Sequence, residues 1–445
     1  MKKSRVVRNI IVSIFFTWVV YSFYNIEFIR SNVGDKAFDL LNEYYLSSKS
    51  EKLDAPNLFL FKVDDYYLEQ KKLLNDRGEL TYGYLFPRNH IADFIKKFDA
   101  HLKKEIENKE DYPKMMFIDF DMSYNSDVHN KKLTKDDKYL LEVLKQDRPY
   151  SIYLPKTSSF NILESSNDKV IQEKIKNGKI VLVSISFKVA VDDITRRYEP
   201  FRKYYKQDSK KEENYTFVGL EVYKQYKSLE NTKNQDDFTQ SKIIYKDYQN
   251  DIENKDTSHK SFWQNFRAYS ASKNLDELVP TKLYNSVIYL GGTHSNSDDT
   301  FSKDFLDRKI SGIEAHANAL MTIFYFDGKL KDLDIWLSLL IITMVIFLCE
   351  YVSLKYRKLF FLLNKIPVVK YIVIDKEKMF VLLVFILLIL VSIYLLSMAL
   401  WFNWLIPSLT ISFVAIIRHI EIYKSFEIKL AKKYKNRINI KRRKI

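Results

Sequence analysis

The sequence predicts an α/β domain with a mixed, mainly parallel sheet, plus four transmembrane α-helices, one N-terminal and three C-terminal. Three observations lead to this fold class. Apolar runs typical of buried strands alternate with amphipathic helical stretches through the middle of the chain. Longer apolar segments lie on both sides of this region. Basic residues gather beside those segments, as they do at the cytoplasmic ends of membrane helices.

The net charge of +15 comes from three short segments. Residues 2–8, 355–378 and 418–445 together hold 22 of the 71 Lys and Arg residues and only 4 of the 56 acidic residues. They therefore carry +18, whereas the rest of the chain carries −3. A basic face or stripe on the domain would suit nucleic acid, but charge placed beside apolar segments indicates membrane topology instead. We therefore expect no nucleic-acid partner.

Four apolar segments are candidates for membrane spans of roughly 20 residues. The first could be read as a cleaved signal peptide, but its apolar region exceeds a signal core of roughly 7–15 residues and no A-x-A-like site follows. We prefer an uncleaved anchor. The fourth is the shortest and contains Pro407. The expected spans are residues 10–29, 335–354, 380–400 and 402–418.

The positions of the basic residues predict one topology for these spans. Residues 1–9, the loop 355–379 and the tail 419–445 are expected in the cytoplasm, which leaves residues 30–334 outside. The single cysteine, Cys349, excludes intrachain disulfides and cysteine metal clusters. We expect a multi-pass protein of the bacterial cytoplasmic (inner) membrane with its main domain extracytoplasmic.

Within this domain the hydrophobic pattern predicts the elements in order. Apolar runs of strand type precede polar or acidic residues, and apolar residues at helical spacing mark the helices. Residues 227–260 are polar and charged, and we expect them to form an exposed insertion. The expected strands are 57–63, 115–120, 151–154, 179–187 and 287–290, and the expected helices are 25–52, 90–101, 135–146, 215–226 and 275–278.

Polar residues at strand ends form the candidate ligand site. Ligands of open α/β sheets bind beyond the carboxyl ends of the strands. The alternative is structural, because acids at strand ends also cap helices and form ion pairs, and histidines pack beside strands. We expect no metal and no cofactor, since no metal-ligand spacing is present. The candidate ligand-binding residues are Asp64, Asp65, Arg88, Asp119, Asp121, Arg196, His294, Asp298, Asp299 and His316.

The order of several short motifs resembles the second type of CHASE domain, an extracytoplasmic sensory domain of bacterial cyclases, histidine kinases and serine/threonine kinases. Val63-Asp64-Asp65 resembles its I-D-D, and Phe86-Pro87-Arg88 its W-P-R with Phe for Trp. Residues 118–120, 192–200 and 290–299 resemble further motifs, although residues 192–200 lack the family's glycine. Gly312 to Asn318 is similar to its p-G-v-e-v-H-A-n. The family layout of one span, a sensor and three spans also agrees.

The resemblance implies a membrane-bound sensor of an unknown extracytoplasmic ligand. Family receptors continue into an output domain, whereas this sequence continues into a short basic tail. We therefore expect signal transduction through a membrane or cytoplasmic partner, with membrane lipids as further partners and a homo-oligomer also compatible with the sequence. The alternative is a structural or envelope-assembly protein. No nucleophile elbow, phosphate loop or kinase signature occurs, so we expect no enzyme.

Overall fold

The structure is a computed structural model, and the chain divides into two compact units. We call Asp39–Leu330 the central unit, and Met1–Phe38 together with Lys331–Ile445 the terminal unit. The structure describes residues 11–12, 14–15, 18–19, 35–42, 53–82, 85–108, 111–122, 133–157, 162–163, 168–189, 193–205, 212–227, 241–244, 266–272, 283–295, 299–302, 309–328, 330–355 and 376–412.

A six-stranded parallel sheet forms the middle of the central unit. Its strands follow the order β10-β1-β11-β2-β3-β4, so β11 inserts between β1 and β2. Six of the seven residues of β1 are buried, as expected for a strand covered on both faces. The mainly parallel sheet expected from the sequence is confirmed. The strands are β1 (Asn57–Val63), β2 (Met115–Asp119), β3 (Ser151–Pro155), β4 (Ile180–Val183), β10 (Phe266–Ser270) and β11 (Ser286–Gly292).

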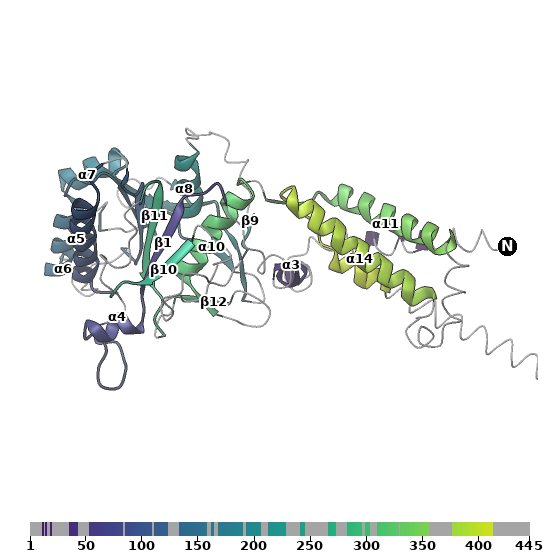
Figure 1. Ribbon diagram of the computed structural model, residues 1–445, viewed down its shortest axis with the longest axis horizontal. Helices are drawn as coiled ribbons and strands as arrows, with labels where there is room; N and C mark the ends of the chain where they lie inside the picture. Colours follow the sequence, from purple (N-terminus) through teal and green to yellow (C-terminus); the bar gives the residue numbers. More distant parts are fainter. Residues whose placement is uncertain are drawn as a thin grey trace, which may run out of the picture. The chain divides into compact units, whose positions relative to one another are not determined.

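Helices cover both faces of this sheet, which makes three layers (Figure 1). On one face lie α4 (Asp65–Gln70), α5 (Arg88–Glu105), α6 (Lys135–Leu144) and α7 (Lys169–Lys176). There Phe61 of β1 packs against Phe94 and Phe98 of α5, with ring centroids 5.3 and 6.2 Å apart. On the other face lie α8 (Val218–Tyr226) and α10 (Gly312–Tyr325). There Phe117 of β2 meets His316 of α10 edge-on at 5.5 Å.

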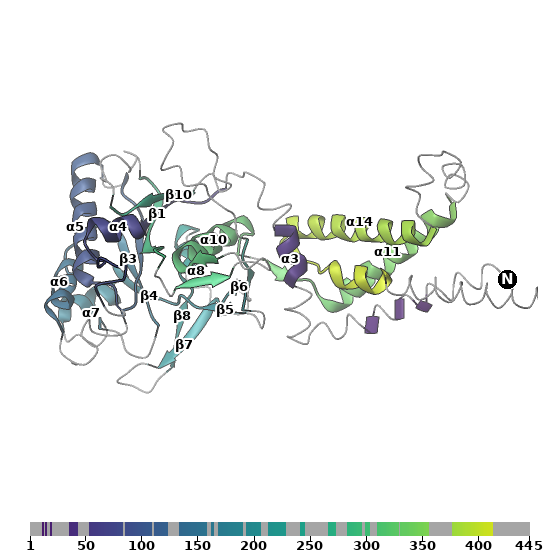
Figure 2. The same ribbon diagram turned by 90° about the horizontal axis from the view of Figure 1, so that it is seen from below.

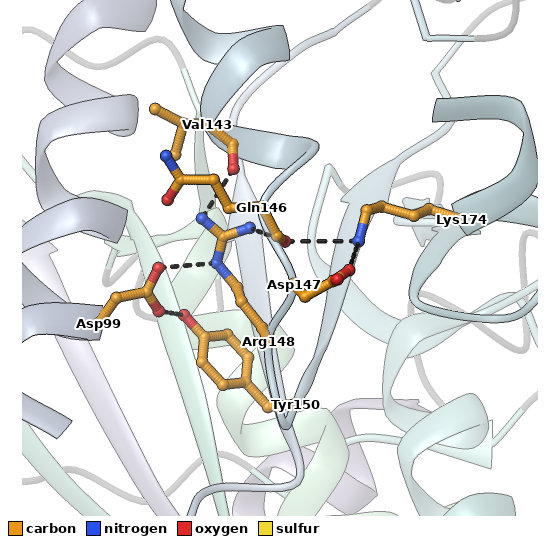
Figure 3. A network of polar contacts seen from close by, with 7 residues as sticks. All are labelled: Asp99, Val143, Gln146, Asp147, Arg148, Tyr150 and Lys174. Carbon is orange, nitrogen blue, oxygen red and sulfur yellow. Dashed lines mark hydrogen bonds and ion pairs between the residues drawn. The ribbon is translucent and has the colours of Figure 1, made fainter. Parts of the chain in front are cut away.

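A polar network joins the helices of the first face to the amino end of β3 (Figure 3). Asp99 of α5 accepts hydrogen bonds from Arg148 Nε at 2.8 Å and from the Tyr150 hydroxyl at 2.5 Å. Arg148 also donates to the carbonyl oxygens of Val143 and Gln146 at the end of α6. The network therefore ends α6 and holds α5 to the start of β3. It lies at the amino ends of the strands, whereas the candidate site is expected at their carboxyl ends.

Smaller antiparallel sheets occupy the region after β4 (Figure 2). A three-stranded sheet has the order β5-β6-β9, β7 pairs with β8, and β12 pairs with β13. The segment 227–260 expected to be exposed contains β9, and Lys242 at its end and the following Ile243 and Ile244 are buried, so that prediction is wrong for these residues. These strands are β5 (Phe187–Val189), β6 (Thr195–Tyr198), β7 (Phe201–Tyr205), β8 (Glu212–Thr216), β9 (Ser241–Lys242), β12 (Thr300–Ser302) and β13 (Lys309–Ser311).

Two helix predictions need comment. The expected helix 215–226 begins later, at Val218, because Tyr215 and Thr216 belong to β8, which pairs with β7. Pairing with a neighbouring strand thus determines the local structure there, a contact that periodicity does not reveal. The expected helix 275–278 lies outside the described residues.

The terminal unit contains α11 (Ile335–Lys355), α14 (Lys376–Ser397) and a short helix at residues 405–412. Residues 331–332 (β14) pair in parallel with residues 400–401 (β15). Trp401 is 2% exposed and meets Phe38 of α3 (Asp35–Leu41) edge-on at 5.0 Å, so it packs within the unit. Large apolar side chains remain exposed along α11 and α14, among them Trp336, Met344 and Leu390.

None of the helices in the described parts of the chain combines the length and the apolar character that crossing a bilayer requires.

Candidate functional site

Several candidate residues lie where β1, β11 and β2 end side by side. Asp64 and Asp65 follow β1, His294 follows β11, and Asp119 closes β2. The chain leaves β11 towards α10 on one face, whereas it leaves β1 and β2 towards α4 and α6 on the other face. Neighbouring strands with connections to opposite faces mark the place where open α/β sheets bind ligands. We call this place the carboxyl edge.

The two acids after β1 have local structural partners. Asp64 caps α4, since its carboxylate accepts the Tyr67 backbone N–H at 2.9 Å, and it also accepts the Ser270 hydroxyl at 2.8 Å. Asp65 accepts both the backbone N–H and the hydroxyl of Ser295, each at 3.0 Å. These bonds tie the ends of β10, β1 and β11 together. Asp65 and Ser295 are exposed, so a ligand at this edge could meet them.

Arg88 is enclosed in the protein. Its Nη1 forms a 2.8 Å ion pair with Asp137, and both side chains are buried. Its Nη2 donates to the Asp121 carbonyl oxygen at 3.1 Å. The Asp137 carboxylate also accepts the backbone N–H and the hydroxyl of Thr134 at the start of α6. Burial lowers the pKa of Arg88, and the Asp137 carboxylate opposes this effect. This geometry favours the structural alternative for Arg88.

Asp121 lies beyond β2 with its side chain turned to the next strand. Its carboxylate accepts the Thr157 hydroxyl at 2.7 Å, and Thr157 follows β3. The carboxyl ends of β2 and β3 are thereby joined. Asp121 is half-buried, so it too remains within reach of solvent.

The most unusual pair of candidates is Asp119 with His316. The Asp119 carboxylate lies 3.8 Å from His316 Nε2, and the side chains are 4% and 2% exposed. That separation is too long for a hydrogen bond. The imidazole is surrounded by the rings of Phe117, Phe187 and Phe217, whose centroids lie 4.5 to 5.5 Å away.

Burial controls the protonation of this pair, because it disfavours charge. It raises the pKa of Asp119 well above the usual range, and the nearby Asp299 carboxylate raises it further. The same burial lowers the pKa of His316 to about 3. Burial therefore favours the uncharged form of both groups.

Asp299 lies at the amino end of α10. Its backbone carbonyl accepts the Gly312 N–H at 2.9 Å, and its carboxylate fills the space that a Cβ on Gly312 would need. Part of the residue is exposed, yet the surrounding protein still removes enough water to raise the pKa of its carboxyl to about 6. Asp299 and Asp119 thus place two carboxyl groups beside the first turn of one helix.

The remaining candidates are placed less fully. His294 is buried in the loop after β11. The backbone of Arg196 belongs to β6, but its side chain and the whole of Asp298 lie outside the described residues. Among the residues that are described, no three His, Cys, Asp or Glu side chains are placed to hold a metal ion.

Two tyrosines near this cluster were not predicted from the sequence. Within the described chain, the buried hydroxyls of Tyr153 and Tyr289 have no hydrogen-bond partner. Burial raises the pKa of Tyr289 well above its usual value, and the Asp119 charge adds to this effect. The period of two along β11 and β2 could have indicated Tyr289, because Tyr289 and Gly291 share a face with Phe117 and Asp119.

A comparison with protein-family models gives a match over most of the chain. The family model of the CHASE2 domain matches residues 12–350. Searches of curated proteins and of solved structures found no significant match.

Proposed function

The chain belongs to the CHASE2 domain family, a family of extracytoplasmic sensory domains, and from this premise we propose that it is a membrane-anchored sensor with its ligand site at the carboxyl edge. In this proposal the central unit lies outside the cytoplasm, and a membrane or cytoplasmic partner receives the signal. The proposal includes no catalytic step.

The observation that supports this function best is the course of α10. The helix begins at Gly312 beside Asp299, presents His316 to Asp119 one turn later, and ends at Tyr325. A few residues beyond, at Leu330, the chain leaves the central unit and enters α11. Helix α10 therefore connects the candidate site to the point where the chain passes from the central unit to the terminal unit. A ligand that binds more tightly to one arrangement of the first turn of α10 would shift the whole helix towards that arrangement.

Membrane anchoring is supported by the surface of the terminal unit. The exposed side chains of α11 include Trp336, Leu340, Met344 and Phe347, and those of α14 include Leu390. Exposed apolar patches of this kind mark contact surfaces, and the hydrocarbon of a bilayer is one suitable environment.

Cysteine labelling in intact cells tests the placement. In a Cys349→Ser background, Tyr284→Cys introduces a thiol at an exposed position of the central unit. A membrane-impermeant maleimide is expected to label it in intact cells. The matched control, Lys3→Cys near the expected cytoplasmic end, should react only after permeabilisation. Protection of Tyr284→Cys in intact cells would refute the extracytoplasmic placement.

Ligand binding is tested on the full chain in nanodiscs. Thermal unfolding is followed in the presence of small-molecule fractions of the culture medium, for the wild type, Ser295→Trp and Tyr284→Trp. Both substitutions introduce the same side chain at exposed positions, but Ser295 follows β11 whereas Tyr284 precedes it. A fraction that stabilises the wild type and Tyr284→Trp, but not Ser295→Trp, supports the site. Equal stabilisation of all three proteins, or none by any fraction, contradicts it and favours an assembly role.

A further inference from the structure

The carboxyl edge brings together three titratable side chains from three different elements. Asp119 ends β2, Asp299 precedes β12, and His316 lies on α10. Asp119 and His316 are buried, and the two carboxyl groups are close enough to influence each other electrostatically. The sensor function proposed above does not explain why an acid and a histidine should be buried together here, beside a second acid that is partly exposed.

Hydrogen bonds among the described residues do not fully compensate for the burial of Asp119 and His316. Within the described residues, Asp119 Oδ2 and His316 Nδ1 have no hydrogen-bond partner. Native proteins rarely leave such groups unsatisfied, and exceptions call for a functional explanation. The aromatic rings around His316 offer no acceptor for a second proton on the imidazole.

Other titratable groups lie around the cluster. The Tyr289 and Tyr153 hydroxyls approach from β11 and β3, and Glu314 of α10 accepts the backbone N–H of Ser311 at 3.2 Å. Lys62 of β1 and Asp119 of β2 are in register across the sheet. Gly291 of β11 lies between them, so their strands are about 10 Å apart. Further groups on the elements packed nearby include Glu221 of α8, Lys156 after β3, His294 after β11, Lys188 of β5 and Lys309 of β13.

We propose that Asp119, Asp299 and His316 form a proton-binding site, which makes extracytoplasmic acidity a signal that this domain detects. Only the extracytoplasmic location of the site and its role in signalling rest on the proposed function. Proton binding itself is a property of the central unit.

The positions of the two carboxyl groups explain how a proton would act. With both ionised, the buried Asp119 carboxylate lies near a second negative charge on the partly exposed Asp299, and the two charges repel each other. A proton removes this repulsion and lets residue 299 pack more firmly against the first turn of α10. Since Gly312 leaves no space between α10 and the Asp299 carboxylate, any change there is passed directly to the helix.

The pKa shifts determine the pH range. The pKa of the Asp299 carboxyl is raised to about 6, and that of Asp119 is raised as well, so the proton binds to the carboxyl groups. A carboxyl group whose pKa is higher in the folded than in the unfolded state adds stability below its unfolded pKa of about 4, and this stability is lost as the pH rises through about 6. His316 has the opposite sign. Its lowered pKa adds stability above about 6.5, which is lost as the pH falls.

The difference in melting temperature between a variant and the wild type, plotted against pH, separates the contribution of the carboxyl groups from that of His316. Thermal unfolding of the full chain in nanodiscs is measured between pH 4.5 and pH 8 for the wild type and Asp299→Asn. Asparagine resembles the protonated acid, so the variant should melt a few degrees above the wild type at pH 8. The difference should shrink to near zero below about pH 5. The matched control Asp76→Asn removes one charge from an exposed position of the central unit. The difference in melting temperature between Asp76→Asn and the wild type should not change with pH. If the difference for Asp299→Asn does not change with pH either, the proposal is overturned.

A second measurement does not depend on stability. The infrared difference spectrum between pH 5 and pH 8 should contain a protonated-carboxyl band that Asp299→Asn weakens, and Asp119→Asn provides the same test at the other carboxyl. An unchanged band in both variants overturns the proposal. Failure of the labelling test alone would refute the extracytoplasmic role, whereas a flat pH difference with Tyr284→Cys labelled from outside would refute the proton site and leave the sensor proposal standing.

Discussion

Replacement of Arg88 by leucine tests whether this residue holds the fold or faces a ligand. Arg88→Leu leaves the Asp137 carboxylate buried without its ion-pair partner, which lies at 2.8 Å in the wild type. Removing one member of a buried pair costs about 3–5 kcal/mol. At about 2 °C per kcal/mol for a domain of this size, the melting temperature should fall by at least about 6 °C.

The assay is thermal unfolding of the full chain in nanodiscs, with Arg77→Leu as the matched control. Arg77 is exposed in the loop after α4, and substitutions of that kind usually change stability by less than about 0.5 kcal/mol. The double variant Arg88→Leu with Asp137→Asn should regain part of the loss, because no buried charge then remains unpaired. If Arg88→Leu has the same melting temperature as Arg77→Leu, the ion pair is not structural and the ligand-binding prediction for Arg88 gains support.

Two further changes probe the packing of the sheet. Gly291→Ala should destabilise the protein by about 1–3 kcal/mol, because a Cβ there would come within 2.7 Å of a side chain on α10; an unchanged melting temperature would show that the helix moves aside without cost. Asp99→Asn should cost about 1.5–3 kcal/mol, because the carboxylate accepts hydrogen bonds from Arg148 and Tyr150. Asp147→Asn, at an exposed position of the same network, should leave the unfolding curve unchanged, and equal losses from both would contradict this view.

Much of the sheet could be predicted from the sequence because its strands are continuous apolar runs. The sequence predicts strands at residues 57–63 and 115–120, and the structure has β1 at residues 57–63 and β2 at residues 115–119. The strand order was not accessible, since β11 follows 167 residues after β2 ends and yet inserts between β1 and β2. Pairing over such distances leaves no local signal.

Several of the candidate residues have local structural partners, for a physical reason. An acid after a strand usually stands before a helix, where the free backbone N–H groups of the first turn compete for its carboxylate. Asp64 illustrates this competition by capping α4. Arg88 was likewise expected in the site, but the sequence does not show that Asp137 lies against it, 49 residues away.

Asp119 differs from these acids because of where β2 ends. Asp119 is the last residue of the strand and shares a face with Phe117, so its side chain points to the face that α10 covers, whereas α6 begins only at Lys135 on the other face. The described residues directly after Asp119 start no helix, and His316 of α10 presents an imidazole nitrogen 3.8 Å from the Asp119 carboxylate. A buried acid in that position lowers stability unless it holds a proton. The pH dependence of Asp119→Asn should therefore follow that of Asp299→Asn if the two carboxyl groups titrate as one site, and independent curves would show that they do not.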